Sequence, residues 1–238
     1  MKLETLSAIN IERAARRPVI VVTDVASGDQ RLVKAAGFAA DPLHSELDKQ
    51  LRMGKSAMIE VDGQKLFLNV YAPTARLVII GAVHISQALA PLARSLDYDV
   101  TVIDPRTAFA SPERFPDVSL IAEWPEEALP PLNIDAYTAF VAVTHDPKID
   151  DPALLHAFER NCFYIGALGS RKTHAKRADR LRAQGVAEAD FARIKAPIGL
   201  NIGAVSPSEI AVSIMAEITA ELRMPKGNPR DSTNASAA

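Results

Sequence analysis

Apolar residues follow one pattern up to about residue 73 and a different pattern beyond it. Helical spacing of leucine and isoleucine predicts an amphipathic helix within residues 2–16, and the apolar run 19–22 predicts a strand. A second helix is expected within residues 42–53. The stretch SAMIEVDGQKLFLNV places Asp62-Gly63 between two apolar-rich runs, which is a strong hairpin signal. We therefore predict a small N-terminal α+β domain over residues 1–73.

From residue 76 onward, short apolar runs alternate with helical spacing. LVIIG, a helical pattern and VTVID together predict a βαβ unit. Three further runs, at 118–122, 139–144 and 162–166, lack a regular polar alternation, which is typical of parallel strands covered on both faces. The predicted fold class is α/β, with a Rossmann-like doubly wound parallel sheet over residues 74–223.

Helix starts in this second stretch carry capping signals. Asp151-Pro152 is expected to open one helix, with Asp151 as N-cap and the proline at the first helical position. Another helix follows Gly169-Ser170. The last begins at SPSE, where Ser206 and Glu209 form a capping box around Pro207.

Composition limits the classes of function. A formal net charge of -2 over 238 residues gives no global attraction to nucleic acid or to anionic membranes. The single Cys162 excludes an internal disulfide framework and multi-cysteine metal sites, and it favours a reducing compartment, the cytoplasm. We expect neither a secretory signal, because the N-terminus carries acidic residues, nor a membrane span. Residues 224–238 have little apolar content and are expected to be a disordered tail.

Ligands of open parallel sheets bind beyond the carboxyl ends of the strands. The first such place is Gly81-Ala82-Val83-His84, where a dinucleotide fold would have a glycine at the position of Val83. Asp104 follows this motif at the sequence spacing of the acidic residue that binds a ribose hydroxyl in dinucleotide folds. A β-branched residue at position 83 would crowd a pyrophosphate, so NAD(P) binding is not expected. The alternative to a nucleotide site is that Gly81 only allows the turn from strand to helix.

The second place is Thr144-His145, where polar groups follow an apolar strand. His145 is a candidate proton carrier. A hydrogen bond within a turn that starts at Asp146-Pro147 explains it equally well, and both interpretations stay open.

The third place, YIGALGSRKT, begins like a phosphate-binding loop, but Arg171 stands where the loop should curl. ATP hydrolysis is therefore not expected. Gly166 and Gly169 allow a tight loop, and Arg171 and Lys172 oppose the helix dipole at a cost of about 0.3–1 kcal/mol each, which is easier to explain if an anion binds there. The alternative is that this stretch only connects the strand to the helix and binds no anion. Cations farther along this helix are interpreted as a solvated face: Lys176, Arg177, Arg180 and Arg182.

The fourth place is APIGLNIGAV, in which Gly199 and Asn201 precede the capped last helix. A ligand loop and a structural connector are both consistent with this pattern.

Several blocks, spread over residues 76–222, resemble the XdhC/CoxI family of accessory proteins for xanthine dehydrogenase and related molybdenum hydroxylases: LVIIGAVHISQALAPLA, VTVIDPR, VAVTHDP, YIGALGSRKTHAKR and PIGLNIGAVSPSEIAVSIMAEI. The resemblance implies a protein that is not itself a metabolic enzyme. It implies transient binding of molybdenum cofactor (molybdopterin), protection of it, and delivery to the apoenzyme after sulfuration. The implied partners are a molybdenum hydroxylase and a cysteine desulfurase, with a homodimer as a further expectation.

The cofactor-binding set that we predict on this basis is Gly81, Ala82, Val83, His84, Asp104, Arg106, Thr144, His145, Gly166, Leu168, Gly169, Ser170, Arg171, Lys172, Gly199 and Asn201. No catalytic residue and no metal ligand is predicted.

This chain departs from the family pattern in three respects. Family members usually have G-A-G-H where this chain has Val83 in the third position, and often Asp in place of Asn201. The glycine-rich and Gly-Gly-Cys-type segments of the family's N-terminal domain are reduced to fragments. Two other hypotheses therefore stay open, a nucleotide-binding oxidoreductase-like protein and a scaffold that docks partners through its basic helix without binding a cofactor.

Overall fold

The computed structural model describes residues 2–225, so most of the predicted tail, residues 226–238, lies outside the described residues. The described part of the chain divides into two compact units: residues 2–73 together with 223–225 form the first, and residues 74–222 form the second. Among the described residues, no helix combines the length and apolar character that crossing a bilayer requires.

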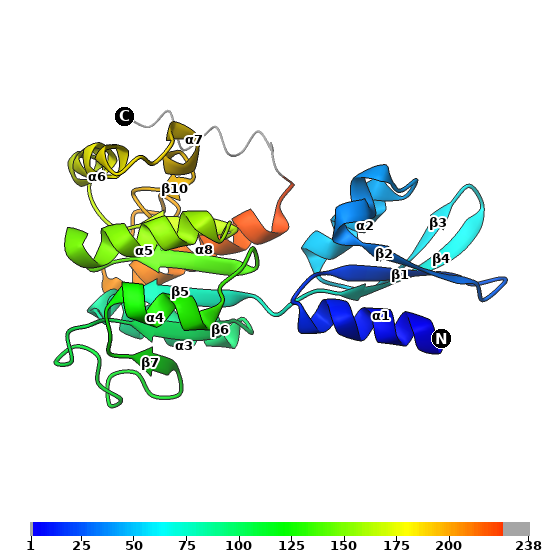
Figure 1. The fold of residues 1–238 in the computed structure, drawn as a ribbon, viewed down its shortest axis with the longest axis horizontal. Helices are drawn as coiled ribbons and strands as arrows, with labels where there is room; N and C mark the ends of the chain where they lie inside the picture. Colours follow the sequence, from blue (N-terminus) through cyan, green and yellow to red (C-terminus); the bar gives the residue numbers. More distant parts are fainter. Residues whose placement is uncertain (1, 226–238) are drawn as a thin grey trace. The chain divides into compact units, whose positions relative to one another are not determined.

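The first unit is a four-stranded antiparallel sheet with helices on both faces (Figure 1). Its strands are β1 (Val19–Asp24), β2 (Gln30–Lys34), β3 (Ala57–Val61) and β4 (Gln64–Tyr71), in the order β2-β1-β4-β3. Its helices are α1 (Leu3–Ala14), the 3₁₀ helix η1 (Ala35–Ala40) and α2 (His44–Met53). The predicted hairpin is confirmed: β3 and β4 pair across Asp62 and Gly63, which both have positive φ, as a tight two-residue turn requires.

Strand β1 is buried on both faces, which explains its unbroken apolar run. Val19 and Val21 pack with Ile9 of α1, whereas Ile20 and Val22 pack on the other face with Leu47 of α2. Alternate side chains of a strand point to opposite faces, so two covered faces need apolar residues at every position.

The second unit is a six-stranded parallel sheet in the order β10-β9-β8-β5-β6-β7. This is the strand order of a doubly wound dinucleotide fold, with its switch point between β5 and β8, and it confirms the predicted fold class. The strands are β5 (Arg76–Ile80), β6 (Asp99–Ile103), β7 (Ser119–Ile121), β8 (Thr138–Ala142), β9 (Tyr164–Ala167) and β10 (Ile194–Lys195). The helices are α3 (His84–Ser95), α4 (Pro125–Leu132), α5 (Pro147–Glu159), α6 (Arg171–Ala183), α7 (Glu188–Phe191) and α8 (Pro207–Arg223).

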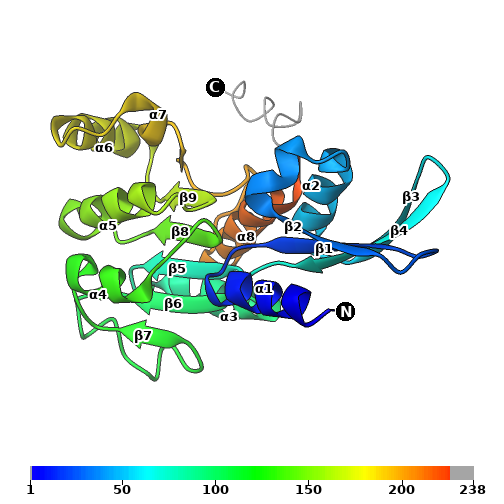
Figure 2. The same ribbon diagram turned by 45° about the vertical axis from the view of Figure 1, so that its right-hand side comes forward.

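Helices cover both faces of this sheet (Figure 2). On one face, Leu77 and Ile79 of β5 belong to a core that includes residues of α3 and α8. On the other face, Val78 and Ile80 belong to a core shared with α4, α5 and α6. Continuous burial on both faces is the reason that the strand runs showed no alternation.

The helix starts were predicted with mixed success. The capping box of α8 is confirmed, because Ser206 Oγ accepts from Glu209 N at 3.3 Å and Glu209 Oε2 accepts from Ser206 N at 2.8 Å. Ser170 is the N-cap of α6, as predicted, and accepts from Thr173 N at 3.2 Å.

The expected helix start at Asp151-Pro152 is wrong. Helix α5 begins at Pro147, and Asp146 is its N-cap, whose side chain accepts from Lys148 N at 3.0 Å. Asp146-Pro147 carries the same N-cap and proline pattern five residues earlier, and its extended backbone suits a cap. Asp151 lies inside the helix and pairs with Arg180 of α6 instead.

Candidate functional site

The switch point between β5 and β8 is tightly packed. Gly81 has φ of +115°, and a Cβ atom there would lie 2.8 Å from Cγ2 of Thr144 and 3.2 Å from its backbone nitrogen. The glycine is therefore required by the close approach of two strand-end loops as well as by its backbone conformation. Val83 is the N-cap residue of α3 and has an extended backbone.

Asp104 is fully buried at the end of β6 and serves the protein's own loops. Its Oδ2 accepts from Ala82 N at 2.8 Å and from Arg106 Nη2 at 2.7 Å, and its Oδ1 accepts from Arg106 Nε at 2.9 Å. Burial by itself would raise the pKa of Asp104, but the hydrogen bonds from Arg106 and Ala82 lower it below the usual value. The carboxylate thus holds two loops together and does not face an open crevice where a ribose could reach it.

Thr144 likewise forms part of the loop's internal network. Its Oγ1 donates to Asp150 Oδ1 at 2.7 Å and accepts from Asp146 N at 3.0 Å. The neighbouring His145 is exposed, has a left-handed backbone with φ of +64°, and lines the mouth of a cavity. Of this pair, only His145 is placed to contact a ligand.

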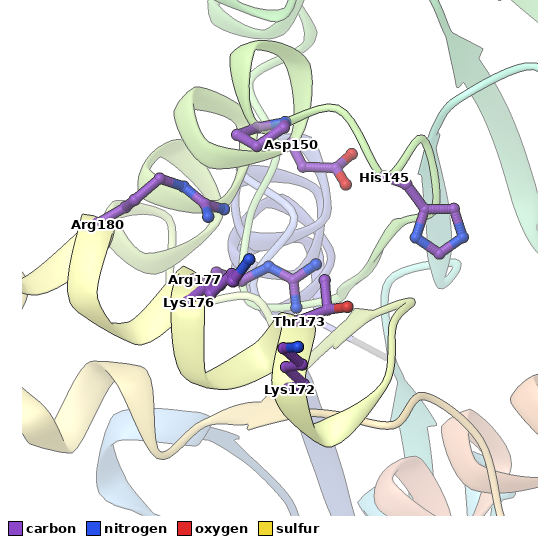
Figure 3. Close-up of a pocket in the computed structure, with 8 residues that line it drawn as sticks. His145, Asp150, Lys172, Thr173, Lys176, Arg177 and Arg180 are labelled. Carbon is purple, nitrogen blue, oxygen red and sulfur yellow. The ribbon is translucent and has the colours of Figure 1, made fainter.

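That cavity, which we call the α5–α6 cavity, has a volume of about 280 Å³ and lies between the start of α5 and helix α6 (Figure 3). Its lining residues are His145, Pro147, Asp150, Lys172, Thr173, Lys176, Arg177 and Arg180. Four of these side chains are cationic, whereas one is a carboxyl. Although the chain as a whole is slightly acidic, this cavity is strongly basic.

A second cavity, the β10–α8 cavity, has a volume of about 630 Å³ and lies beside the loop that joins β10 to α8. Its walls are mostly apolar, and its polar groups are Arg171, Lys195, Asn201, Ser213 and Glu217. Glu217 Oε2 accepts from Tyr164 Oη at 2.6 Å and from Gly199 N at 2.9 Å.

The loop beside this cavity is fixed directly onto α8. Gly199 has φ of +90°, and a Cβ there would clash with Ser213 Oγ. Ser213 Oγ in turn donates to Leu200 O at 2.6 Å. The loop that carries Asn201 is thus held in one conformation by a helix, which suits a preformed site.

The predicted site residues are divided between these places. Arg171 and Lys172, which were expected to act together, line different cavities. His145 and Lys172 belong to the α5–α6 cavity, and Leu168, Arg171, Gly199 and Asn201 belong to the β10–α8 cavity. The predicted residues at the switch point between β5 and β8 are Gly81, Ala82, Val83, His84, Asp104, Arg106 and Thr144.

Gly166 does not take part in the tight loop that was predicted for it. It lies inside β9, and a Cβ there would come within 2.6 Å of Ile198 Cδ1, so a glycine is needed for packing. The turn falls at Gly169, whose φ is +136°.

Sequence reasoning missed Arg177, Asp150 and Glu217. The interpretation of Arg177 as part of a solvated face is wrong, since only 2% of the residue is exposed. Arg177 precedes Leu181 by one helical turn, and Leu181 is fully buried, so the spacing was a signal that Arg177 lies on the inner face.

Comparisons with known proteins place this architecture in a family. The model described as the XdhC Rossmann domain matches residues 77–218. The chain is 36% identical over 154 residues to a Bacillus subtilis protein named as a probable subunit of xanthine dehydrogenase, and 32% identical over 148 residues to the molybdenum cofactor insertion chaperone PaoD of Escherichia coli. It is also 37% identical over 155 residues to the Escherichia coli protein YqeB.

These three alignments cover 62–64% of this chain, and they span only 28% of YqeB, 44% of the Bacillus subtilis protein and 40% of PaoD. A solved structure of a xanthine dehydrogenase from Bacillus halodurans matches 96% of this chain and 67% of that chain with a TM-score of 0.64, and at 22% identity it shows the fold alone. Because the family model covers more than half of its length, this chain belongs to the XdhC Rossmann-domain family.

Proposed function

We propose that this protein is an accessory protein in the maturation of a molybdenum hydroxylase, and that it binds molybdenum cofactor and delivers it to that enzyme. The names of two relatives, a cofactor insertion chaperone and a probable subunit of xanthine dehydrogenase, support the maturation role. A cysteine desulfurase as a second partner, a homodimer and a cytoplasmic location stay predictions.

The observation that carries the binding proposal is the β10–α8 cavity. A pterin is flat and has an edge of hydrogen-bond donors and acceptors, so it needs apolar walls and a few fixed polar groups. Ile198 and Leu200 supply such walls, and Glu217 and Asn201 supply a carboxylate and an amide on the same lining. Arg171 adds a cation suited to a phosphate end. The residues present therefore fit the cofactor.

We assign three roles on this basis. The Glu217 carboxylate accepts from the amino edge of the pterin, Asn201 orients it, and Arg171 pairs with the phosphate. The bound cofactor supplies redox chemistry to the hydroxylase that receives it, whereas this chain holds and releases it. An open loop edge, with Ile202 54% exposed and Val205 84% exposed, is consistent with release to a partner.

The test is cofactor retention by protein produced in cells that synthesise the cofactor. The cofactor is extracted and quantified from the wild type and from the Glu217→Gln and Arg171→Gln variants. We expect each variant to retain about tenfold less, which corresponds to about 1.4 kcal/mol. Arg182→Gln, on the outer part of the same helix as Arg171, is the charge-matched control and should retain as much as the wild type.

Equal retention by all variants would contradict the assignment of the β10–α8 cavity. If the wild type retains no cofactor but still raises the activity of a coexpressed hydroxylase, the scaffold hypothesis replaces cofactor binding. Activity of the client enzyme should therefore be measured on the same cells.

The nucleotide hypothesis has the strand order in its favour, but the site geometry opposes it. Thr144 packs against Gly81 at the switch point, and Asp104 is fully engaged by Arg106 and Ala82. We expect calorimetry to show no micromolar binding of NAD or NADP. Val83→Gly should not create such binding, because it leaves the Asp104 network unchanged.

A further inference from the structure

Arg177 of α6 is a buried cation with an incomplete set of partners. It is 2% exposed, and its Nη2 donates to Leu168 O at 2.9 Å. Its Nε and Nη1 atoms are buried and have no hydrogen-bond partner among the described residues. A guanidinium carries five N–H donors, and burying it without acceptors costs several kcal/mol, on the order of a broken buried ion pair. The arrangement calls for an acceptor that the part of the chain described by the structure does not supply.

Asp150, which lines the same cavity from α5, does not fill that need. Its Oδ1 accepts from Thr144 Oγ1 at 2.7 Å, but its Oδ2 is buried and has no partner in the part of the chain that the structure describes. The two side chains attract each other electrostatically, yet they form no direct hydrogen bond. Burial raises the pKa of Asp150 above its usual value.

Further cations surround Arg177 in the α5–α6 cavity. Figure 3 shows the side chains of Lys172, Lys176 and Arg177 on α6, with His145 and Asp150 across the cavity. Arg180 is neutralised by Asp151, because its Nε donates to Asp151 Oδ2 at 2.5 Å and its Nη2 donates to Asp151 Oδ1 at 3.0 Å. Lys172 and Lys176 have no ion pair with a described acidic residue in the chain. The first turn of α6 contains no acidic residue either.

We infer that the α5–α6 cavity is a phosphate-binding site, in which Arg177 is the central donor and Lys172 and Lys176 supply the remaining charge. A tetrahedral oxyanion offers acceptors in several directions, which matches N–H groups that point away from the one bond to Leu168. A cavity of about 280 Å³ is of a size for a small anion rather than for a whole cofactor. The phosphate can be a free ion or the end of a larger phosphorylated ligand.

This inference does not depend on the proposed function. It concerns a different cavity from the one assigned to the pterin, and its probes contain no molybdenum. Failure of cofactor retention in the Glu217 and Arg171 variants would leave it unchanged, and failure of phosphate binding would leave the β10–α8 cavity unchanged.

The experiment is a calorimetric titration with inorganic phosphate, alone and in competition with adenosine monophosphate or with adenosine. All titrations are run in about 0.15 M sodium chloride, which screens nonspecific attraction to surface charges. We expect inorganic phosphate to bind the wild type with a Kd below about 1 mM. Lys176→Gln and Lys172→Gln should each weaken binding about fivefold or more, and Arg177→Lys about tenfold or more, because one ammonium cannot replace the guanidinium donors.

Arg182→Gln is the matched control, since it removes the same charge from α6 but Arg182 pairs with Glu188 outside the cavity. It should bind phosphate within about twofold of the wild type. If Arg177→Lys does not fold, the two lysine variants decide the question, because neither side chain is buried.

Binding of inorganic phosphate that adenosine monophosphate does not displace would identify the free ion as the ligand. Displacement by the monophosphate, with adenosine alone inactive, would identify the phosphate end of a larger ligand. No measurable binding at about 10 mM phosphate, or an equal loss in Arg182→Gln, would overturn the inference and leave a cavity filled only by water.

Discussion

At the scale of single residues, two glycines of the loop beside the β10–α8 cavity share a backbone conformation but differ in their neighbours. Gly199 has φ of +90° and Gly203 has φ of +76°. A Cβ at Gly203 would meet no atom within 4 Å, whereas at Gly199 it would clash with Ser213 Oγ and lie 3.1 Å from Ile214 N. The two positions separate backbone strain from steric conflict.

We expect Gly203→Ala to lower the free energy of unfolding by about 1 kcal/mol, which is the cost of a positive φ with a Cβ atom. Gly199→Ala should cost about 3 kcal/mol, because Ser213 cannot move without breaking its bond to Leu200. Urea unfolding followed by the fluorescence of Trp124 measures both, since this single tryptophan lies in the second unit. Equal losses would show that the loop moves away from α8 to accommodate the added methyl group.

Cys162 offers a second test at this scale. Only 3% of the residue is exposed, and burial raises the pKa of its thiol to about 12. At pH 8 about one folded molecule in 10,000 then carries the thiolate that reacts with a disulfide reagent. We expect native protein to react at least about 100 times more slowly than protein in urea. Rapid labelling of the native form would mean that the strand end opens frequently.

At the scale of elements, Glu12 joins α1 to the sheet of the first unit. Its Oε2 accepts from Arg17 Nε at 2.5 Å, and its Oε1 lies 2.8 Å from Lys34 Nζ at the end of β2. The hydrogen bonds from Arg17 and from Lys34 lower the pKa of Glu12 to about 2. The group therefore stabilises the fold above its ordinary pKa of 4.5, and this contribution is lost as the pH falls from about 4.5 to about 2.

We expect Glu12→Gln to lower the thermal midpoint at pH 6 and to reduce the dependence of that midpoint on pH between about 4.5 and 2. Circular dichroism at a series of pH values measures this. Glu4→Gln, an exposed position on the same helix, should reproduce the wild-type curve. Identical curves for Glu12→Gln and the wild type would show that the ion pair contributes nothing to stability.

The elements that could be predicted are those with a decisive local signal. Asp62-Gly63 gave the hairpin, and Ser206 with Glu209 gave the start of α8, because both signals depend on residues close in the chain. The start of α5 was misassigned because Asp146-Pro147 and Asp151-Pro152 carry the same pattern, and only tertiary contacts, such as that of Asp151 with Arg180, distinguish them.

The candidate site was less predictable than the fold for the same reason. Proximity to strand ends selected His145, Lys172 and Asn201, which all line one of the two cavities, but it could not show that Arg171 and Lys172 point into different cavities. They are consecutive residues of a helix, so their side chains point in different directions, and the cavity that each one reaches depends on how α6 packs. Arg177 and Glu217 were missed because their positions in the cavities depend on burial and on partners far away in the sequence, such as Gly199 for Glu217.

At the scale of the whole molecule, charge is distributed unevenly. A formal net charge of -2 argues against a general polyanion-binding surface, yet it conceals the α5–α6 cavity with its four cationic side chains. Net charge describes nonspecific association, whereas a local cluster determines which small anion is bound. The same distinction separates the phosphate titration from its Arg182 control.

The division of the chain into two compact units makes a prediction for the isolated second unit. Each unit has hydrophobic cores of its own, and the strands of each sheet pair only with strands of the same unit. We expect a fragment of residues 74–225 to unfold cooperatively in urea, with a Trp124 fluorescence transition like that of the full chain. A fragment of residues 81–225 is the control. It lacks β5, which lies between β6 and β8, so it should show no cooperative transition. If the 74–225 fragment also fails to unfold cooperatively, the second unit requires residues 1–73 for its stability, and the boundary at Pro73 marks a change of architecture without marking an independent folding unit.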